Sequence, residues 1–234
     1  MAWREAVTDV LWPPSCAACD AVLPAPGAFC ERCAHEVLEL PSVHCPRCAE
    51  PGDGVCARCV TQPPPWEKAW APFEHEGSLA RAIHRFKYED RADLARPLGL
   101  LMAATSRTTL QSMPGVLLPL PLHEARYRTR GFDQAALLAK EVATATGRSL
   151  QLDWLTRTRD TARQVGLSEE MREANVHGAF VVAADVKDAD IVLVDDVLTT
   201  GASAREAVRV LTSAGARRVF VLTLARARRE NASR

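Results

Sequence analysis

The sequence lacks the features of a membrane-spanning or secreted protein. No run of about 18 apolar residues occurs, which argues against a transmembrane helix. Residues 1–14, MAWREAVTDVLWPP, carry Arg4, Glu5 and Asp9 through their only apolar stretch, which is atypical of a secretory signal. We predict instead an amphipathic first helix stopped by Pro13 and Pro14, in a cytoplasmic protein without a membrane span.

The chain also has no excess of either charge and few aromatic side chains. Its 29 Lys and Arg balance 29 Asp and Glu, so net charge neither recruits nor excludes nucleic acid. Aromatic residues make up 6% of the chain, whereas proteins that bind single-stranded nucleic acid usually stack bases on aromatic rings. Apolar residues at 47% and charged residues at 25% are the ordinary balance of a globular protein.

Cysteine is absent after position 59. All eight cysteines fall in four CxxC pairs: Cys16 and Cys19, Cys30 and Cys33, Cys45 and Cys48, Cys56 and Cys59. This distribution divides the chain into an N-terminal module, residues 1–65, and a cysteine-free body, residues 66–234. The proline-rich segment 62–65 lies between them.

Each CxxC places two thiolates on one tight turn, so four pairs predict two structural Zn²⁺ sites of four thiolates each. A metal would supply the stability that so small a module does not obtain by burying apolar side chains. Disulfides, an iron–sulfur cluster and redox catalysis by one pair are the alternatives. We favour pairing of neighbouring knuckles over a cross-brace of first with third and second with fourth. With four Arg against eight Asp and Glu in residues 1–66, a scaffold or partner surface fits the module better than a nucleic-acid clamp.

The body alternates apolar strand patterns with helix patterns, which predicts an α/β fold with a mainly parallel sheet flanked by helices. We expect strands at 116–120, 191–194 and 219–225, weaker strands at 150–155 and 178–182, and a short edge strand at 70–73. We expect helices at 78–88, at 94–104 with an interruption near Pro97, at 134–146 and at 203–215. In such folds, ligands bind at the carboxyl ends of the strands.

One segment, IVLVDDVLTTGAS at 191–203, combines a buried strand with two acids and a run of small residues. Ionised Asp195 and Asp196 can accept hydrogen bonds from a vicinal diol. The small and hydroxyl residues at 199–203 open a helix, where free N–H groups favour a phosphate. The deduced ligand is a ribose phosphate. The alternative is a solvated acidic turn followed by an ordinary helix start.

The whole pattern resembles the phosphoribosyl pyrophosphate (PRPP) signature of type I phosphoribosyltransferases, and the resemblance spans about residues 70–226. It implies that Asp195 and Asp196 bind the ribose 2′- and 3′-hydroxyls. It also implies a metal, usually Mg²⁺, on the pyrophosphate and ribose hydroxyls. The residues expected on the 5′-phosphate are Thr199, Thr200, Gly201, Ala202 and Ser203.

The order of the motifs narrows the resemblance further. Four CxxC pairs, then FKY at 86–88, RTRGFDQ at 128–134, RDTARQ at 159–164, GAF at 178–180 and VDDVLTTGAS at 194–203 together resemble the ComF family. Members combine a double zinc ribbon with a phosphoribosyltransferase-like domain, and the family is linked to DNA uptake in natural transformation. RGFDQ departs slightly from the more familiar RGFNQ.

Basic and polar residues near these motifs are candidates for further contacts. In the loop after the strand at 116–120, where this architecture places pyrophosphate contacts, we expect Arg126, Arg130 and Gly131 to act. The FKY motif gives Lys87 a similar role on phosphate. Solvated surface side chains are the alternative. The polar segment 157–175 predicts a lid over PRPP or a plain surface connection, with Arg163, Gln164, Arg172 and Asn175 as the residues to test.

Three functional hypotheses follow. The first is a Mg²⁺- and PRPP-dependent phosphoribosyltransferase that releases pyrophosphate, with an unknown acceptor and no identifiable general base. The second is a non-enzymatic competence protein that binds single-stranded DNA or a helicase partner in DNA uptake. The third is a regulator that senses PRPP without turnover.

Overall fold

The computed structural model describes residues 13–160 and 169–228, and the expected first helix lies outside them. The prediction of a mainly parallel sheet is confirmed, since every pair of neighbouring strands in the main sheet runs in the same direction. The strand order is β3, β6, β7 and β1, and β2 also pairs with β7. The strands are β1 (Ala69–Trp70), β2 (Phe73–Glu74), β3 (Val116–Pro119), β6 (Asp190–Leu198) and β7 (Arg218–Arg226).

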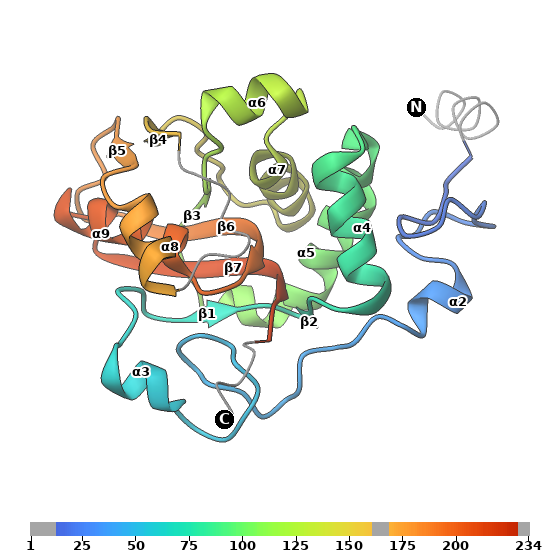
Figure 1. Cartoon of the computed structure of the whole chain (residues 1–234), viewed down its shortest axis with the longest axis horizontal. Coiled ribbons are helices and arrows are strands. Elements are labelled where there is room, and N and C mark those ends of the chain that lie inside the picture. Colours follow the sequence, from blue (N-terminus) through green and yellow to red (C-terminus); the bar gives the residue numbers. More distant parts are fainter. Residues whose placement is uncertain (1–12, 161–168, 229–234) are drawn as a thin grey trace.

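Helices cover both faces of this sheet (Figure 1). One face packs against three helices, α4 (Gly77–Tyr88), α5 (Ala95–Gln111) and α7 (Gln134–Thr146). The other face packs against α9 (Ala202–Ser213). Strand β6 shows why its sequence is continuously apolar: Val192 and Val194 enter the first core, whereas Ile191 and Leu193 enter the second.

A smaller antiparallel pair stands apart from the main sheet and packs into the α9 side of the core. It consists of β4 (Leu155–Arg157) and β5 (Phe180–Val182), and helix α8 (Glu169–Val176) precedes β5. The strand predicted at 150–155 is therefore displaced toward the C-terminus. Leu150 forms only an isolated bridge with Leu117.

Other boundaries also differ from the predictions, and the edge strand expected at 70–73 is divided into β1 and β2. Helix α5 is not interrupted at Pro97 and continues to Gln111, because a proline in the first turn replaces an N–H that has no helical partner. The short 3₁₀ turn η1 (Ala92–Leu94) precedes it. The expected arginine-bearing loop after β3 is helix α6 (Glu124–Arg130), whose N-cap His123 accepts the Ala125 N–H. Strand β6 continues through the acid pair to Leu198, whereas the sequence suggested that it ends before Asp195.

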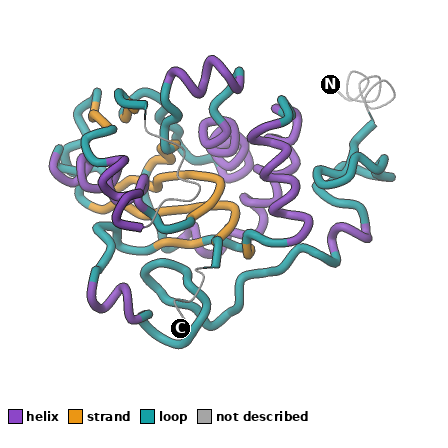
Figure 2. Tube along the Cα trace, in the orientation of Figure 1, coloured by secondary structure: helices purple, strands orange, loops and turns teal. Residues whose placement is uncertain are grey.

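The N-terminal module is mostly turns, with two short helices, α2 (Glu31–Ala34) and α3 (Ala57–Thr61) (Figure 2). Its first half lies near α4, and its second half lies below β1 and β7 (Figure 1). Between the halves, Leu40 N–H donates to Pro72 O at 2.8 Å and Glu74 N–H donates to Leu38 O at 2.9 Å, so the chain runs beside β2. Within the described ranges, no helix has both the length and the apolar content needed to cross a bilayer.

Candidate functional site

A cavity of about 950 Å³ opens at the carboxyl ends of β3 and β6. It gathers residues that are far apart in the sequence, from the end of α4, from α6 and from the segment that joins β6 to α9. The predicted site residues that line it are Lys87, Arg126, Arg130, Asp195, Asp196, Thr199, Gly201, Ala202 and Ser203.

The rest of the predicted set is placed differently. Thr200 and Gly131 are described but do not line the cavity. Asn175 lies on α8, and its backbone carbonyl accepts Arg159 Nη2 at 2.9 Å. Arg163 and Gln164 lie outside the described residues, as does the side chain of Arg172.

Asp196 is a buried carboxylate that pairs with the Lys87 ammonium. Its Oδ1 lies 2.7 Å from Lys87 Nζ, and its side chain is 3% exposed. Among the described groups, Asp196 Oδ2 has no hydrogen-bond partner. Burial opposes the charge of Lys87, but the adjacent Asp196 and Asp195 carboxylates outweigh it and raise the pKa of Lys87. The pair leaves one buried acceptor oxygen for a ligand.

Asp195 is half-buried and lies next to this pair. Its Oδ1 accepts the Asp196 N–H at 2.8 Å. Burial, together with the neighbouring Asp196 carboxylate, raises the pKa of Asp195 to about 8. A cation or a hydroxyl donor at this position would favour the ionised form.

Residues 199–203, which the sequence pattern predicts to bind the 5′-phosphate, are called the phosphate loop below. Gly201 stands at the N-cap of α9 with φ 82°, a left-handed conformation that favours glycine. A Cβ atom on Gly201 would lie 3.0 Å from the Trp66 ring, so the loop packs closely on an aromatic side chain. Ala202 N–H donates to Thr200 Oγ1 at 3.4 Å. The start of a twelve-residue helix thus borders the cavity, where its N–H groups suit an anion.

Asp133 of the RGFDQ motif holds part of the cavity wall in place through hydrogen bonds to two backbone N–H groups. Its Oδ1 accepts the Ala136 N–H at 3.0 Å as the N-cap of α7, and its Oδ2 accepts the Leu122 N–H at 2.7 Å. Leu122 lines the cavity. Because both carboxylate oxygens are used, Asp at this position has a structural role that an Asn amide, with one oxygen, fulfils only in part.

The arginines of α6 separate into two groups. Arg126 lies 3.7 Å from Asp160, and Arg130 donates to Gln134 Oε1 and lies over the Tyr88 ring at 5.3 Å. Arg128 instead pairs with Glu124 at 2.5 Å, with 76% of its side chain exposed. Helical geometry therefore directs alternate arginines of RYRTR toward and away from the cavity.

Arg157 is a cavity residue that the sequence analysis missed. It ends β4, is 9% exposed, and lies over the Phe180 ring at 5.4 Å. Burial and the positive charge of Arg126 lower the pKa of Arg157. Leu155 and Arg157 face inward and Thr156 faces outward. This alternation identifies Arg157 as inward-facing only when the register of β4 is known.

The cysteines form two clusters, Cys16, Cys19, Cys30 and Cys33 and then Cys45, Cys48, Cys56 and Cys59, each with its sulfurs within 4.8 Å of one another. This confirms sequential pairing and excludes the cross-brace. All eight are free thiols, so the disulfide alternative is wrong. The Sγ separations of 3.8 Å for Cys19 and Cys30 and 3.6 Å for Cys48 and Cys56 fit a tetrahedral site. Four sulfurs about 2.3 Å from Zn²⁺ would lie about 3.8 Å apart.

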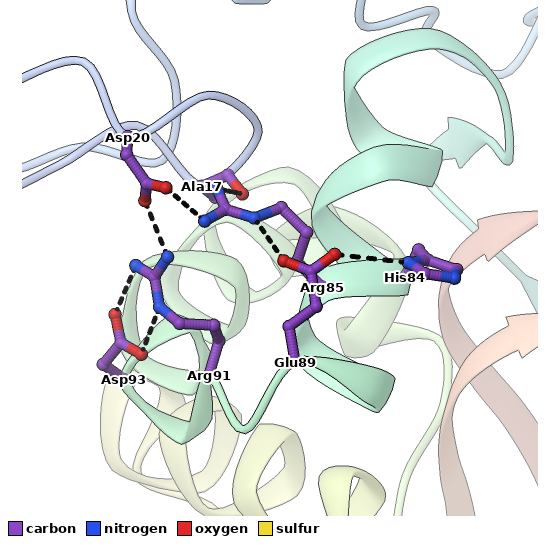
Figure 3. A network of polar contacts seen from close by, with 7 residues as sticks. All are labelled: Ala17, Asp20, His84, Arg85, Glu89, Arg91 and Asp93. Atoms are coloured by element: carbon purple, nitrogen blue, oxygen red, sulfur yellow. Dashed lines mark hydrogen bonds and ion pairs between the residues drawn. The ribbon is translucent and has the colours of Figure 1, made fainter.

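The two clusters contact different parts of the body. Beside the first cluster, Asp20 pairs with Arg85 and, at 2.6 Å, with Arg91, while Arg85 donates to Ala17 O at 3.1 Å (Figure 3). Arg85 belongs to α4, the helix that carries Lys87. Beside the second cluster, Arg58 Nη1 donates to Thr200 O of the phosphate loop at 3.2 Å.

Models of two known domain families match parts of the chain. Residues 7–60 match the double zinc ribbon domain, and residues 129–233 match the phosphoribosyl transferase domain.

Relatives match over most of the chain. The DNA utilization protein YhgH of Escherichia coli (strain K12) is 34% identical over 179 residues, which cover 73% of this chain and 77% of the relative. Competence protein F of Haemophilus influenzae is 31% identical over 179 residues, covering 74% and 78% respectively. A solved structure of the allosteric regulatory enzyme of purine biosynthesis aligns with a TM-score of 0.42 at 22% identity, covering 60% of this chain and 29% of that one.

Proposed function

Since the chain belongs to the ComF family, with a double zinc ribbon and a phosphoribosyl transferase domain, we propose that it binds PRPP with Mg²⁺ and transfers the phosphoribosyl group to an acceptor. The zinc module would occupy residues 1–65, and the PRPP-binding domain residues 66–234. Reduced cysteine clusters suit a reducing compartment, which supports a cytoplasmic location.

One observation carries the proposal. Asp196 Oδ2 is buried and has no hydrogen-bond partner among the described groups. Asp196 lines the cavity of about 950 Å³ that the start of α9 also lines. An unpaired buried acceptor is costly unless a ligand supplies a donor or a cation. A ribose diol meets this need at the acids, while its 5′-phosphate reaches the phosphate loop.

The residues have distinct roles in this proposal. Asp195 and Asp196 orient the ribose through its hydroxyls, and Thr199 through Ser203 hold the 5′-phosphate. Lys87 balances the charge of the acid pair and, with Arg126 and Arg130, forms the side of the cavity assigned to pyrophosphate. Gly131, which does not line the cavity, ends α6 directly after Arg130. The segment with Arg163, Gln164, Arg172 and Asn175 is assigned to exclusion of water.

The acid pair has the donor chemistry that Mg²⁺ prefers, since carboxylate oxygens are hard ligands. When bound, Mg²⁺ would neutralise charge on the pyrophosphate leaving group. In the transfer, a bond forms between the acceptor and the anomeric carbon, while the bond from that carbon to pyrophosphate oxygen breaks. Pyrophosphate leaves with the electron pair, and the proton displaced from the acceptor passes to water. The chain contributes mainly by positioning and by charge stabilisation, and no general base is assigned.

The test is pyrophosphate release from PRPP and Mg²⁺ in the presence of a panel of nucleobases. If the double substitution Asp195→Asn with Asp196→Asn abolishes this release, the result supports the transferase. Binding of PRPP without release for any base would leave a PRPP-sensing regulator as the better description.

A second function, binding of single-stranded DNA or a helicase partner, is favoured by the names of the relatives, DNA utilization protein and competence protein. The aromatic side chains give it limited support. Phe86 is fully buried and stacks on Phe132 with ring centroids 5.4 Å apart, which leaves Tyr88 and Tyr127 exposed near the cavity arginines. Salt-dependent binding of single strands, unaffected by the two Asp→Asn substitutions, would favour this function.

A further inference from the structure

A buried arginine joins the second cysteine cluster to the phosphate loop. Arg226, the last residue of β7, is 0% exposed. On the cluster side it donates through Nε to Cys48 O at 3.1 Å, and it pairs with the Glu50 carboxylate. On the loop side its Nη1 donates to Leu198 O and Thr199 O, each at 2.7 Å. A fully buried arginine is stable only when its donors are paired in this way.

These bonds fix the direction of consecutive peptide units. Arg226 holds the carbonyls of Leu198 and Thr199, and Arg58, which lies between Cys56 and Cys59, holds the carbonyl of Thr200. In a trans peptide, the C=O and N–H groups point in opposite directions. The N–H groups of the next residues, Thr199, Thr200 and Gly201, therefore point away from the two arginines. Such a row of N–H groups is what an anion requires.

We propose that Arg226 is a positioning residue that makes the geometry of the phosphate loop depend on a metal in the second cysteine cluster. A metal on Cys45, Cys48, Cys56 and Cys59 fixes the turns that present Cys48 O, Glu50 and Arg58. Arg226, held by Cys48 O and Glu50, then fixes the direction of the Leu198 and Thr199 carbonyls. Without the metal, the partners of Arg226 on the cluster side lose their fixed positions, and the loop loses its support.

The first cluster provides an internal control. Its ion pairs go to Arg85 and Arg91 at the end of α4 and at η1, and the described contacts of Asp20 and Ala17 do not reach the phosphate loop (Figure 3). Loss of its metal should therefore disturb α4 and leave the loop in place.

Hydrogen exchange of the full-length, zinc-loaded chain, without any phosphate ligand, tests the link. Cys56→Ser removes a ligand of the second cluster, and Cys30→Ser removes one of the first. We expect each variant to lose one Zn²⁺. Peptides spanning 199–205 should exchange about tenfold faster in Cys56→Ser and at the wild-type rate in Cys30→Ser, since loss of charge-assisted hydrogen bonds favours local opening.

Arg226→Lys tests the residue itself, because Lys keeps the charge but lacks the planar fork that reaches both sides. We expect two Zn²⁺ to remain and the 199–205 peptides to exchange as fast as in Cys56→Ser, with no further increase in the double variant. Arg218→Lys is the matched control, since Arg218 begins the same strand and pairs with Asp190. If Arg226→Lys does not fold, Glu50→Ala replaces it as the test, because Glu50→Ala leaves Arg226 in place. Hydrogen exchange of the loop should then also be faster than in the wild type.

Wild-type exchange of the loop in Cys56→Ser after loss of one Zn²⁺ would overturn the inference, as would wild-type exchange in Arg226→Lys. The inference rests on the proposed function only for the identity of the loop's ligand. Because exchange is measured without ligand, a coupled loop that fails to bind PRPP would refute the function and leave the coupling intact.

Discussion

Lys87 and Asp196 form a charged pair, 2.7 Å between Nζ and Oδ1, across 109 residues of sequence. The pair joins the last turn of α4 to the last third of β6 and borders the cavity. It holds Asp196 against the end of α4 and leaves Asp196 Oδ2 for a ligand. Both the stability of the site and its ionisation therefore depend on one lysine.

Lys87→Met should destabilise the protein by about 3 kcal/mol, because the change leaves a buried carboxylate without its counter-ion. Chemical denaturation measures the loss. Lys87→Met combined with Asp196→Asn should recover most of it, since neither buried charge then remains. Lys140→Met, at an exposed position on α7, is the control and should have little effect. A double variant no more stable than Lys87→Met would contradict the pairing.

The pKa of Asp195 makes stability depend on pH. Its pKa is raised to about 8 in the folded chain, so between its ordinary value and pH 8 the folded state holds a proton that the unfolded state has lost. The contribution of Asp195 is complete at acidic pH and declines as pH rises to 8. Asp195→Asn should remove this decline. The free energy of unfolding of both proteins, measured by denaturation at a series of pH values, checks this prediction. If the two proteins show the same dependence on pH, the pKa of Asp195 is not raised.

Gly201→Ala should impair the phosphate loop more than a glycine substitution elsewhere. The backbone cost of a left-handed alanine is about 1–2 kcal/mol. Gly147→Ala is a matched control, because Gly147 has φ 69° but nothing within 4 Å of an added Cβ, whereas at Gly201 that Cβ meets Trp66 at 3.0 Å. The excess loss of stability in Gly201→Ala reports this contact. Equal losses of stability would show that the Trp66 ring moves aside at no measurable cost.

Asp133→Asn should cost about 1 kcal/mol, since the amide replaces one of the two acceptor oxygens that receive the Ala136 and Leu122 N–H groups. The thermal midpoint should fall while affinity for PRPP changes little, because Asp133 lies behind the cavity wall. A large loss of affinity with unchanged stability would instead indicate a direct role in binding.

Metal content should be two Zn²⁺ per chain, one for each cysteine cluster. Elemental analysis measures it, and Cys19→Ser and Cys48→Ser should each reduce it to one. Iron in place of zinc, with visible absorbance, would identify an iron–sulfur cluster.

Local pattern was sufficient to predict the parallel sheet, its two covered faces and the acid pair with its loop. Strand β6 is apolar at every position from Ile191 to Val194 and is buried on both faces, so its sequence carries the signal alone. The four CxxC pairs likewise indicated two thiolate sites and their sequential pairing.

Long-range partners could not be predicted in the same way. Arg226 reads as an ordinary strand end, yet it is fully buried because Cys48, Glu50 and Thr199 surround it. Arg157 was missed for a related reason, since its inward direction depends on the register of β4 with β5. Helix α6 is different, because a capping His123 and a left-handed Gly131 were both present as local signals.

The most direct test of the central claim is calorimetric titration of MgPRPP into the zinc-loaded protein and into the Asp195→Asn, Asp196→Asn variant. The account predicts binding at one site per chain in the wild type. It also predicts an affinity at least about a hundredfold weaker in the variant, because charge-assisted hydrogen bonds from the ribose hydroxyls are lost. Equal affinity in the two proteins, with both correctly folded, would contradict it.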